Sequence, residues 1–442
     1  MIQIIKNAHI LTNDRQHPQA EALVIEDRYV AALGAQKDLE KQYPSATISD
    51  AGGRLVLPGF INAHMHFYST YARGLAVDKA PNSFLQILSD LWWRLDKTLD
   101  DEAVYYSALI PTISAVKNGV TSVIDHHASP DAIDGSLDRI EDALSRVGLR
   151  ATLCYEVSDR DGKEVAKAGL RENERYINKC ARQKQKDDAN LFSAMFGLHA
   201  AFTLGDDTLR AAAELGTKLD TGFHLHLAEG TDDDAQPQYG ISTTERLHRF
   251  GILGAKTITA HAIHIADTDR ELLARTDTIV VHNPQSNMNN TVGRADVFAM
   301  LKKGILVGLG TDGMTPSLFP DIRTAYLLHK HDLADPTVGW SEIRQIVMEN
   351  NAQIYQRVSG QKVGKLAPGY VADLVMFDYY PPTPLTTENL WGHLLFGIAD
   401  TPVHTVIING RVILKDYRLT GIDEEEIAAK SREVAKRVWD KF

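Results

Sequence analysis

The stretch PGFINAHMH, residues 58–66, has the pattern of a buried strand that ends in two histidines separated by one residue. Side chains at positions i and i+2 of a strand lie on the same face, so His64 and His66 can converge. Imidazole nitrogens are common ligands of zinc, iron and similar ions. Such a pair taken alone is more often held by local hydrogen bonds in a turn, so its meaning depends on where the strand lies in the fold.

Seven further apolar, β-branched runs follow along the chain, each with a helical or loop-plus-helix segment after it. They cover residues 121–127, 150–157, 192–200, 222–229, 256–265, 277–284 and 305–312. Together with residues 54–64 they make eight strand–helix units, the alternation typical of a parallel sheet. An α/β fold is therefore expected, with a closed (β/α)8 or TIM barrel over residues 57–362 and its site at the C-terminal strand ends.

The flanks of this barrel have strand and turn patterns instead of helical spacing. Residues 1–56 end where the barrel starts and residues 363–420 begin where it ends. We therefore expect the two flanks to combine into one small composite β-sandwich. Residues 421–442 have acidic residues first, basic residues behind them and apolar residues at helical spacing, which predicts a C-terminal helix.

Composition and charge restrict the class of function. The chain has 442 residues, of which 44% are hydrophobic, and a net charge of −11 without an acidic tail. This argues against nucleic acid or an anionic membrane as partner and favours a small molecule. The two cysteines, Cys154 and Cys180, are too few for a disulfide scaffold and suit a reducing compartment. The first residues lack an export signal and no long apolar run occurs, so we expect a cytoplasmic protein.

The fifth predicted strand carries further polar groups at its end, in HLHLAEG. His226 is nearer the strand end than His224, so we expect His226 to be a metal ligand and His224 to be a packed, hydrogen-bonded histidine of the barrel interior. Glu229 follows three residues after His226. This carboxylate could be a solvated loop residue, but its reach to a metal-bound water favours a role as proton shuttle.

Strands six and eight complete the candidate site with His261 in TAHAIHI and Asp312 in GLGTDG. A carboxylate at the end of a buried strand is costly unless it meets a cation or several donors. With His64, His66 and His226, Asp312 makes a set of three nitrogens and one oxygen that leaves a position open for water. The joint placement of these residues on strand ends predicts a catalytic metal site.

These residues resemble the amidohydrolase superfamily, in the branch of cytosine, guanine and adenosine-type deaminases and triazine hydrolases. The resemblance rests on PGFINAHMH, HLHLAE, AHAIH, HNPQSN and GLGTDG in that order and covers nearly the whole chain; HMHFYSTYARGL and DHHASP are most similar to SsnA-type aminohydrolases. It implies a composite β-sandwich and a homo-oligomer such as a homodimer. It also implies roles for the residues already singled out: metal ligands His64, His66, His226 and Asp312, the proton-shuttling acid/base Glu229, and the water-orienting His261.

The implied function is metal-dependent hydrolysis of a C–N bond in a small N-heterocycle. The favoured reaction is hydrolytic deamination of an amino-substituted purine-, pterin- or pyrimidine-like ring, with ammonia as product and Asp312 passing a proton to the departing nitrogen. The alternative is ring opening of a cyclic amidine or amide in an oxidised purine-type substrate. A non-catalytic metal- or ligand-binding protein is disfavoured, because Glu229 and His261 are not needed to hold a metal.

One divalent ion per chain is expected, because the fourth-strand segment LFSAMFGLHAAFT lacks the lysine that bridges two metals in dinuclear relatives. Zinc is preferred from the ligand types, with Fe2+ or Mn2+ as alternatives.

The substrate pocket is less clearly defined by the sequence, and HNPQSN has Asn283 where many deaminases have cysteine. Aromatic side chains at the mouth could stack on a planar heterocycle. Each candidate also has a structural alternative, namely a core histidine, a helix-core tryptophan or a surface ion pair. The predicted substrate contacts are Trp92, Trp93, Arg94, His127, His199, Ser286 and Asn287.

Overall fold

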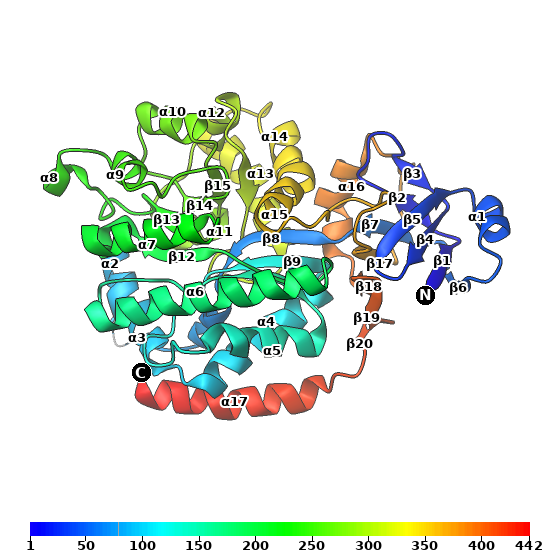
Figure 1. Cartoon of the computed structure of the whole chain (residues 1–442). Helices are drawn as coiled ribbons and strands as arrows, with labels where there is room; N and C mark the ends of the chain where they lie inside the picture. Colours follow the sequence, from blue (N-terminus) through cyan, green and yellow to red (C-terminus); the bar gives the residue numbers. More distant parts are fainter. Residues whose placement is uncertain (78) are drawn as a thin grey trace.

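The computed structural model describes residues 1–77 and 79–442 and contains a barrel of parallel strands surrounded by helices (Figure 1). Two ladders form the barrel wall. The first runs through β11 (Phe192–Ala194), β10 (Arg150–Leu153), β9 (Val120–Asp125) and β8 (Phe60–Met65). The second runs through β12 (Phe196–Ala200), β13 (Phe223–Leu227), β14 (Ile258–His261), β15 (Ile279–His282) and β16 (Val307–Leu309).

The two ladders meet at both edges and so close the barrel. β11 and β12 are two halves of the fourth strand, interrupted at Met195, and a bridge from Val157 to Leu198 spans that break. A bridge from Met65 to Asp312 joins the first and eighth strands, where the backbone N–H of Asp312 also donates to the His64 carbonyl at 3.0 Å. The closed eight-stranded barrel predicted from the sequence is confirmed.

Gly59 separates two strands where the sequence predicts a single one over residues 54–64. β7 (Leu55–Pro58) pairs with strands outside the barrel, and β8 starts the barrel. A Cβ atom at position 59 would lie 2.1 Å from Oγ1 of Thr121, so only glycine fits at this crossing. β7 therefore extends across the predicted boundary between the N-terminal flank and the barrel, which we expect between residues 56 and 57.

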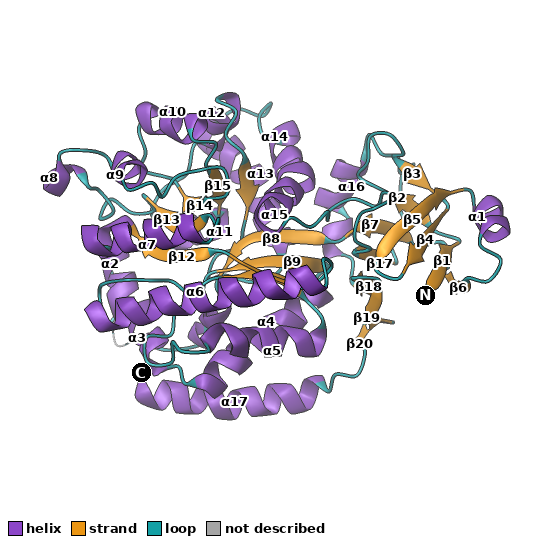
Figure 2. Ribbon diagram, viewed as in Figure 1, coloured by secondary structure: helices purple, strands orange, loops and turns teal. Residues whose placement is uncertain are grey.

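Helices cover the outer face of the barrel, as the ribbon diagram shows (Figure 2). Their polar ends follow ordinary capping chemistry; the Asp100 side chain, for example, accepts from the Ala103 N–H at 2.9 Å at the start of α4. The helices that follow or flank barrel strands are α4 (Asp101–Lys117), α5 (Ser136–Val147), α6 (Lys163–Lys186), α7 (Asp206–Lys218), α8 (Gln236–Tyr239), α9 (Thr243–Arg249), α10 (Asp267–Arg275), α11 (Pro284–Asn289), α12 (Val297–Lys302), α13 (Leu318–Leu333), α14 (Trp340–Gln345) and α15 (Asn351–Ser359). The mouth segment after β8 contains a 3-10 helix, η1 (Phe67–Ala72), then α2 (Phe84–Ile87), the π-helix η2 (Leu88–Trp92) and α3 (Trp93–Leu95).

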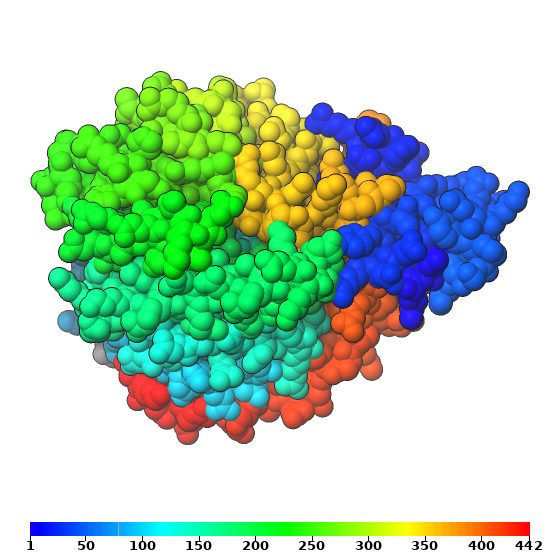
Figure 3. All heavy atoms as spheres, viewed as in Figure 1, coloured from blue at the N-terminus to red at the C-terminus, as the bar shows by residue number. Residues whose placement is uncertain are grey.

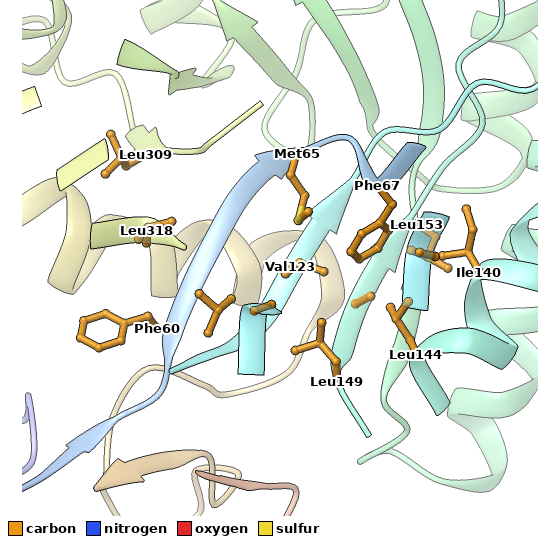
Figure 4. Close-up of a cluster of buried hydrophobic side chains, with 14 of the residues drawn as sticks. Phe60, Met65, Phe67, Val123, Ile140, Leu144, Leu149, Leu153, Leu309 and Leu318 are labelled. Carbon is orange, nitrogen blue, oxygen red and sulfur yellow. The ribbon is translucent and has the colours of Figure 1, made fainter. Parts of the chain in front are cut away.

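Apolar side chains from strands and surrounding helices form the main hydrophobic core between them. Phe60, Met65 and Val123 come from the first two strands and pack in one cluster with Ile140 and Leu144 of α5 (Figure 4). Removing such side chains from water supplies roughly 1.5–3 kcal/mol each. The core therefore fixes the strand ends at which the polar side chains are presented.

The N- and C-terminal flanks form the second unit, a composite of two sheets beside the barrel. One sheet has the order β5 (Tyr29–Gly34), β4 (Ala22–Glu26), β1 (Ile2–Lys6), β6 (Thr47–Asp50). The other has the order β20 (Arg418–Leu419), β19 (Arg411–Lys415), β18 (Val403–Ile408), β17 (Leu374–Phe377), β7, β2 (His9–Leu11), β3 (Gln19–Ala20). The short helices α1 (Gln36–Gln42) and α16 (Leu390–Phe396) belong to these flanks. The predicted pairing of the two flanks is thus present.

A buried ion pair connects the two units. Arg150 of β10 donates from Nε and Nη2 to the two carboxylate oxygens of Asp373, each at 3.0 Å, and both side chains are buried. Asp373 also accepts from the backbone N–H of Asn409 at 2.7 Å. Such a bidentate pair is specific in geometry and costly to break on one side only.

The predicted terminal helix is α17 (Glu424–Lys441), which lies along one side of the barrel (Figure 3). Asp423 caps it by accepting from the N–H groups of Glu425 and Glu426. Near its end, Trp439 Nε1 donates to the Tyr71 carbonyl at 2.8 Å. In the part of the chain that the structure describes, there is no helix whose length and hydropathy suit a membrane crossing.

Candidate metal centre and active site

Four side chains from three barrel strands meet at the C-terminal mouth: His64, His66, His226 and Asp312. One ligand atom from each lies within 4.8 Å of all the others. His66 Nε2 is 3.2 Å from His226 Nε2 and 3.0 Å from Asp312 Oδ1, and His64 Nε2 is 3.5 Å from the same oxygen. Three imidazole nitrogens and one carboxylate oxygen at this separation are suited to a divalent transition metal.

The opposite nitrogen of each histidine is held in place, which fixes the direction of the ring. His66 Nδ1 donates to the carbonyl of His126 at 2.6 Å, and His226 Nδ1 donates to the carbonyl of His199 at 3.0 Å. His64 differs, because its Nδ1 lies 2.8 Å from Nε2 of the His224 side chain. Such contacts orient ligands and raise their basicity. His224 is thus the buried, hydrogen-bonded histidine that the sequence predicts.

Asp312 and His261 both have a left-handed backbone, with φ of 53° and 74°. Positive φ values are uncommon outside glycine and cluster at functional sites. Burial opposes ionisation of Asp312, but the imidazoles of His64 and His66, whose Nε2 atoms lie 3.5 and 3.0 Å from Oδ1, hold the pKa of its carboxyl well below the usual range. Asp312 is therefore an anion in this cluster.

A second group of Glu229, His261 and Asp312 adjoins the four ligands. His261 Nε2 lies 3.4 Å from Glu229 Oε2 and 3.7 Å from Asp312 Oδ2. Its Nδ1 donates to Asn287 Oδ1 at 2.7 Å, and Asn290 Nδ2 donates to Glu229 Oε1 at 3.3 Å. Burial raises the pKa of Glu229. The arrangement places a buried carboxyl of raised pKa and an oriented imidazole beside the metal ligands.

A pocket leads from these groups to the surface, enclosing about 760 Å³ of space including its open part. Four of the seven predicted substrate contacts line it: Trp92, Trp93, His199 and Ser286. The sequence analysis missed several other lining residues, namely Tyr68, Phe84, Glu156, Phe202, Asp233, Asn289, Asn290 and Met314. The wall combines aromatic side chains with the carboxylates of Glu156, Glu229 and Asp233 and the amides of Asn289 and Asn290.

The other three predicted contacts lie outside the pocket wall. Arg94 donates to the Phe442 carbonyl, and its guanidinium lies 4.1 Å from the centre of the Phe442 ring, so it contacts the end of α17. His127 is fully buried, with Nε2 at 3.0 Å from Ser129 Oγ. Asn287 is fully buried beneath His261 and orients that ring instead of facing the pocket. The structure thus turns each of these three side chains to another partner, and direct substrate contact by them stays a prediction.

Glu156 is the missed residue that sequence reasoning could have found. It follows β10 in the predicted strand RATLCYEV, and so occupies the same kind of strand-end position as the other polar groups. Burial raises its pKa to about 7. Its position in the sequence was the available signal, because an acidic residue at the end of a buried strand predicts a residue of the site.

A (β/α)8 barrel whose strand ends present three histidines, an aspartate and an adjacent glutamate defines a metal-dependent hydrolase. Residues 55–413 match the model of the Amidohydrolase family, and the chain belongs to that family. The predicted superfamily membership and the prediction of an enzyme are therefore confirmed.

Similar proteins cover nearly the whole chain. A 5'-deoxyadenosine deaminase of Methanosarcina mazei is 29% identical, and a 5-methylthioadenosine/S-adenosylhomocysteine deaminase of Desulforudis audaxviator is 30% identical, each over 98% of both chains. Among solved structures, an adenosine deaminase from Xanthomonas campestris with bound zinc has a TM-score of 0.85 at 21% identity, covering 99% of this chain and 98% of the other. Atrazine chlorohydrolase TrzN from Arthrobacter aurescens, complexed with zinc, has a TM-score of 0.82 at 20% identity, covering 98% and 100%.

Proposed function

We propose that this protein is a zinc-dependent aminohydrolase that releases the amino group of an adenine-like heterocycle as ammonia. The observation that carries the proposal is the position of Glu229 and His261 directly beside the four candidate ligands at the barrel mouth. The deaminase names of relatives at 29–30% identity support the reaction and the adenine-like ring. The expectation of hydrolytic deamination agrees with them.

The donor set fits one zinc ion. His64, His66, His226 and Asp312 would hold it, and in the described part of the chain the buried Nε2 atom of His64 has no hydrogen-bond partner. Zinc bound by this type of site lowers the pKa of water toward neutrality and so supplies a nucleophile for attack on an electron-poor ring carbon. Fe2+ and Mn2+ are the alternatives that metal analysis of the purified protein distinguishes.

Glu229 is the group that moves protons. Asn290 fixes one of its oxygens, which leaves Oε2 directed to the space beside His261. Oε2 accepts a proton from the attacking water and delivers it to a ring nitrogen of the substrate. The raised pKa of this buried carboxyl suits a group that must hold a proton between these two steps.

His261 and Asp312 complete the chemistry. Asn287 accepts the hydrogen of His261 Nδ1, so Nε2 of the neutral ring is an acceptor. It points to the space between the two carboxylates, where it accepts from the attacking water and orients it. Asp312 Oδ2 accepts the second proton of the attacking water, after Glu229 has taken the first, and passes it to the departing amino nitrogen, which leaves as ammonia. Trp92 and Trp93 provide flat apolar surfaces on which a planar ring can stack.

Ammonia release from zinc-loaded protein tests this function, measured with the ultraviolet spectrum against aminopurines, adenine nucleosides, pterins, aminopyrimidines and oxidised purines. We expect ammonia from an adenine-like ring in the wild type and none in Asp312→Ala. Loss of ring absorbance without ammonia would instead identify ring opening, and no change in any substrate would refute the hydrolase proposal.

We also keep the homodimer and the cytoplasmic location as proposals. Light scattering of the purified protein checks the first, and cell fractionation checks the second.

A further inference from the structure

Glu156 is a pocket carboxylate that no donor of the described part of the chain serves. Its side chain is 5% exposed, and its buried Oε2 atom has no hydrogen-bond partner within residues 1–77 and 79–442. Two histidines face it: His199 Nε2 lies 3.3 Å from Oε1, and His126 Nδ1 lies 3.4 Å from Oε2. Whether hydrogens lie between these atoms decides what the group can bind.

The hydrogen on His199 is committed to the other side of its ring. The Thr203 hydroxyl donates its single hydrogen to the Ala200 carbonyl at 3.0 Å. Its oxygen therefore accepts from His199 Nδ1, which lies 2.8 Å away. In the neutral imidazole the remaining nitrogen, Nε2, is then an acceptor, and this is the atom that faces Glu156.

His126 has the same arrangement. Its Nε2 lies 3.0 Å from the carbonyl of His224, which can only accept, so Nε2 carries the hydrogen. Nδ1 is left as an acceptor, and it is buried with no hydrogen-bond partner among the residues that the structure describes. The carboxylate of Glu156 is thus flanked by two nitrogen lone pairs, and a buried cluster that holds only acceptors needs a donor from elsewhere.

Glu156 and His199 both line the pocket, so the missing donor can come from a bound molecule. The pair also lies close to the metal centre: His66 Nδ1 is 4.0 Å from Glu156 Oε2, and ligand atoms of Glu156, His199 and His226 lie within 4.8 Å of one another. A group that meets this pair therefore belongs to the reacting ring itself or to an atom directly attached to it.

The other pocket carboxylates are already engaged. Asp233 accepts from the backbone N–H groups of Ala228 at 2.7 Å and Phe202 at 3.1 Å. Glu229 accepts from Asn290 and faces His261. Glu156 is thus the pocket carboxylate that is left to meet a substrate.

We propose that the Glu156 carboxylate and His199 Nε2 form an acceptor pair that reads a ring N–H of the substrate. The inference rests on the proposed deaminase function and deepens it by naming the substrate class. Nitrogens N1, N3 and N7 of an N9-substituted adenine are acceptors and would be repelled by the pair. The amino group of such a ring does carry N–H donors, but it is the leaving group and must face Asp312. The enzyme therefore favours amino-substituted rings with a free N–H, such as aminopurine bases, over N9-substituted adenine nucleosides.

The experiment compares bases that differ only by an N-methyl group: adenine with 9-methyladenine, and guanine with its 1-, 7- and 9-methyl derivatives. The kcat/KM for ammonia release is measured in zinc-loaded wild type and Glu156→Gln, and equilibrium dissociation constants of the same bases are measured by calorimetry. For the base that keeps the N–H, we expect Glu156→Gln to lower kcat/KM and to weaken binding about 10- to 100-fold. For the methylated base that lacks this N–H, both changes should be less than 3-fold. Glu141→Gln is the matched control, because Glu141 is a buried carboxylate beside Tyr176 and Lys179, outside the site. Its kcat/KM and dissociation constants are expected to equal those of the wild type.

The outcomes separate this inference from the function on which it rests. If Glu156→Gln changes kcat/KM and binding equally for the N–H base and the methylated base of every pair, the inference is overturned. Ammonia release in the same assay still upholds the deaminase function. Wild-type kcat/KM and binding in Glu156→Gln would also overturn the acceptor pair. Glutamine imitates a protonated glutamate that donates to His199, so this result would mean that Glu156 does not accept from the substrate. If no base releases ammonia, the deaminase proposal fails, and the calorimetric comparison alone upholds or overturns the acceptor pair.

Discussion

His224 offers a direct test of how the candidate metal site is built. Backbone carbonyls hold His66 and His226, and substitution cannot remove them, whereas the His224 side chain holds His64. His224→Leu removes the acceptor for His64 Nδ1 and keeps an apolar side chain in the barrel interior. The ring of His64 then loses its fixed direction toward the other ligands.

The magnitude follows from the bond that is lost. A hydrogen bond between neutral groups contributes about 0.5–1.5 kcal/mol, and a buried N–H left without an acceptor costs about 1–3 kcal/mol. Because part of this penalty is relieved by movement of the free ring, a net loss of about 1.4–2.7 kcal/mol is expected, which is a 10- to 100-fold weaker zinc affinity. His224→Gln, whose amide oxygen can accept from His64, should recover most of the loss.

Competition with a chelating dye measures zinc affinity directly and does not depend on knowing the substrate. His282→Leu is the matched control. His282 is also a buried histidine on a barrel strand, but neither of its ring nitrogens has a hydrogen-bond partner among the described residues. Its zinc affinity should equal that of the wild type. Affinities of His224→Leu and His282→Leu that agree within twofold would refute the assignment of His224 as the residue that orients His64.

Three further outcomes are expected. Glu229→Gln should retain zinc, as metal analysis will show, but lower kcat about 100- to 10,000-fold, and normal turnover would exclude Glu229 as the acid/base. Arg150→Met leaves the Asp373 carboxylate buried without its cation, so urea denaturation should show a free energy of unfolding about 3–5 kcal/mol lower than that of the wild type. A decrease below about 1 kcal/mol would contradict this interpretation of the ion pair. Burial raises the pKa of Asp321 to about 8, so the folded protein binds a proton that the unfolded chain releases near pH 4, and stability from this group is lost as pH rises through 8. Asp321→Asn should therefore gain stability relative to the wild type between pH 5 and pH 8, and a parallel pH profile would refute it.

The sequence predicts the barrel and the meeting of His64, His66, His226 and Asp312 because both follow from simple periodicity. Alternate residues of a strand share a face, and the ends of parallel strands gather at one mouth. Since the apolar runs mark the strands clearly, the polar residues that end them could be placed together without knowledge of the helices.

Other features could not be predicted because they depend on tertiary packing. Residue order does not show that Gly59 divides one apolar run between two sheets, or that the fourth strand breaks at Met195. The same holds for Arg94, whose direction is set by the end of α17, and for Asn287, which is turned beneath His261. Hydrogen-bond direction at Glu156 likewise appears only when Thr203 and the neighbouring carbonyls are in place.

The join between β8 and β16 has a consequence for the order in which the protein assembles. His64 and Asp312 belong to the first and last barrel strands, and nearly the whole barrel sequence lies between them. The edge there is held by the bridge from Met65 to Asp312, by a few backbone hydrogen bonds, and by buried side-chain hydrogen bonds from Asn62 to Thr311 and from Asn351 to the carbonyls of Ile61 and Leu309. A contact between segments so distant in the chain carries a high entropic cost and forms late in folding. An ion bound by both His64 and Asp312 would cross-link the two strands at this edge. In the metal-free protein, the amide hydrogens of Met65 and Thr311 should therefore exchange with solvent faster than those of the neighbouring strands.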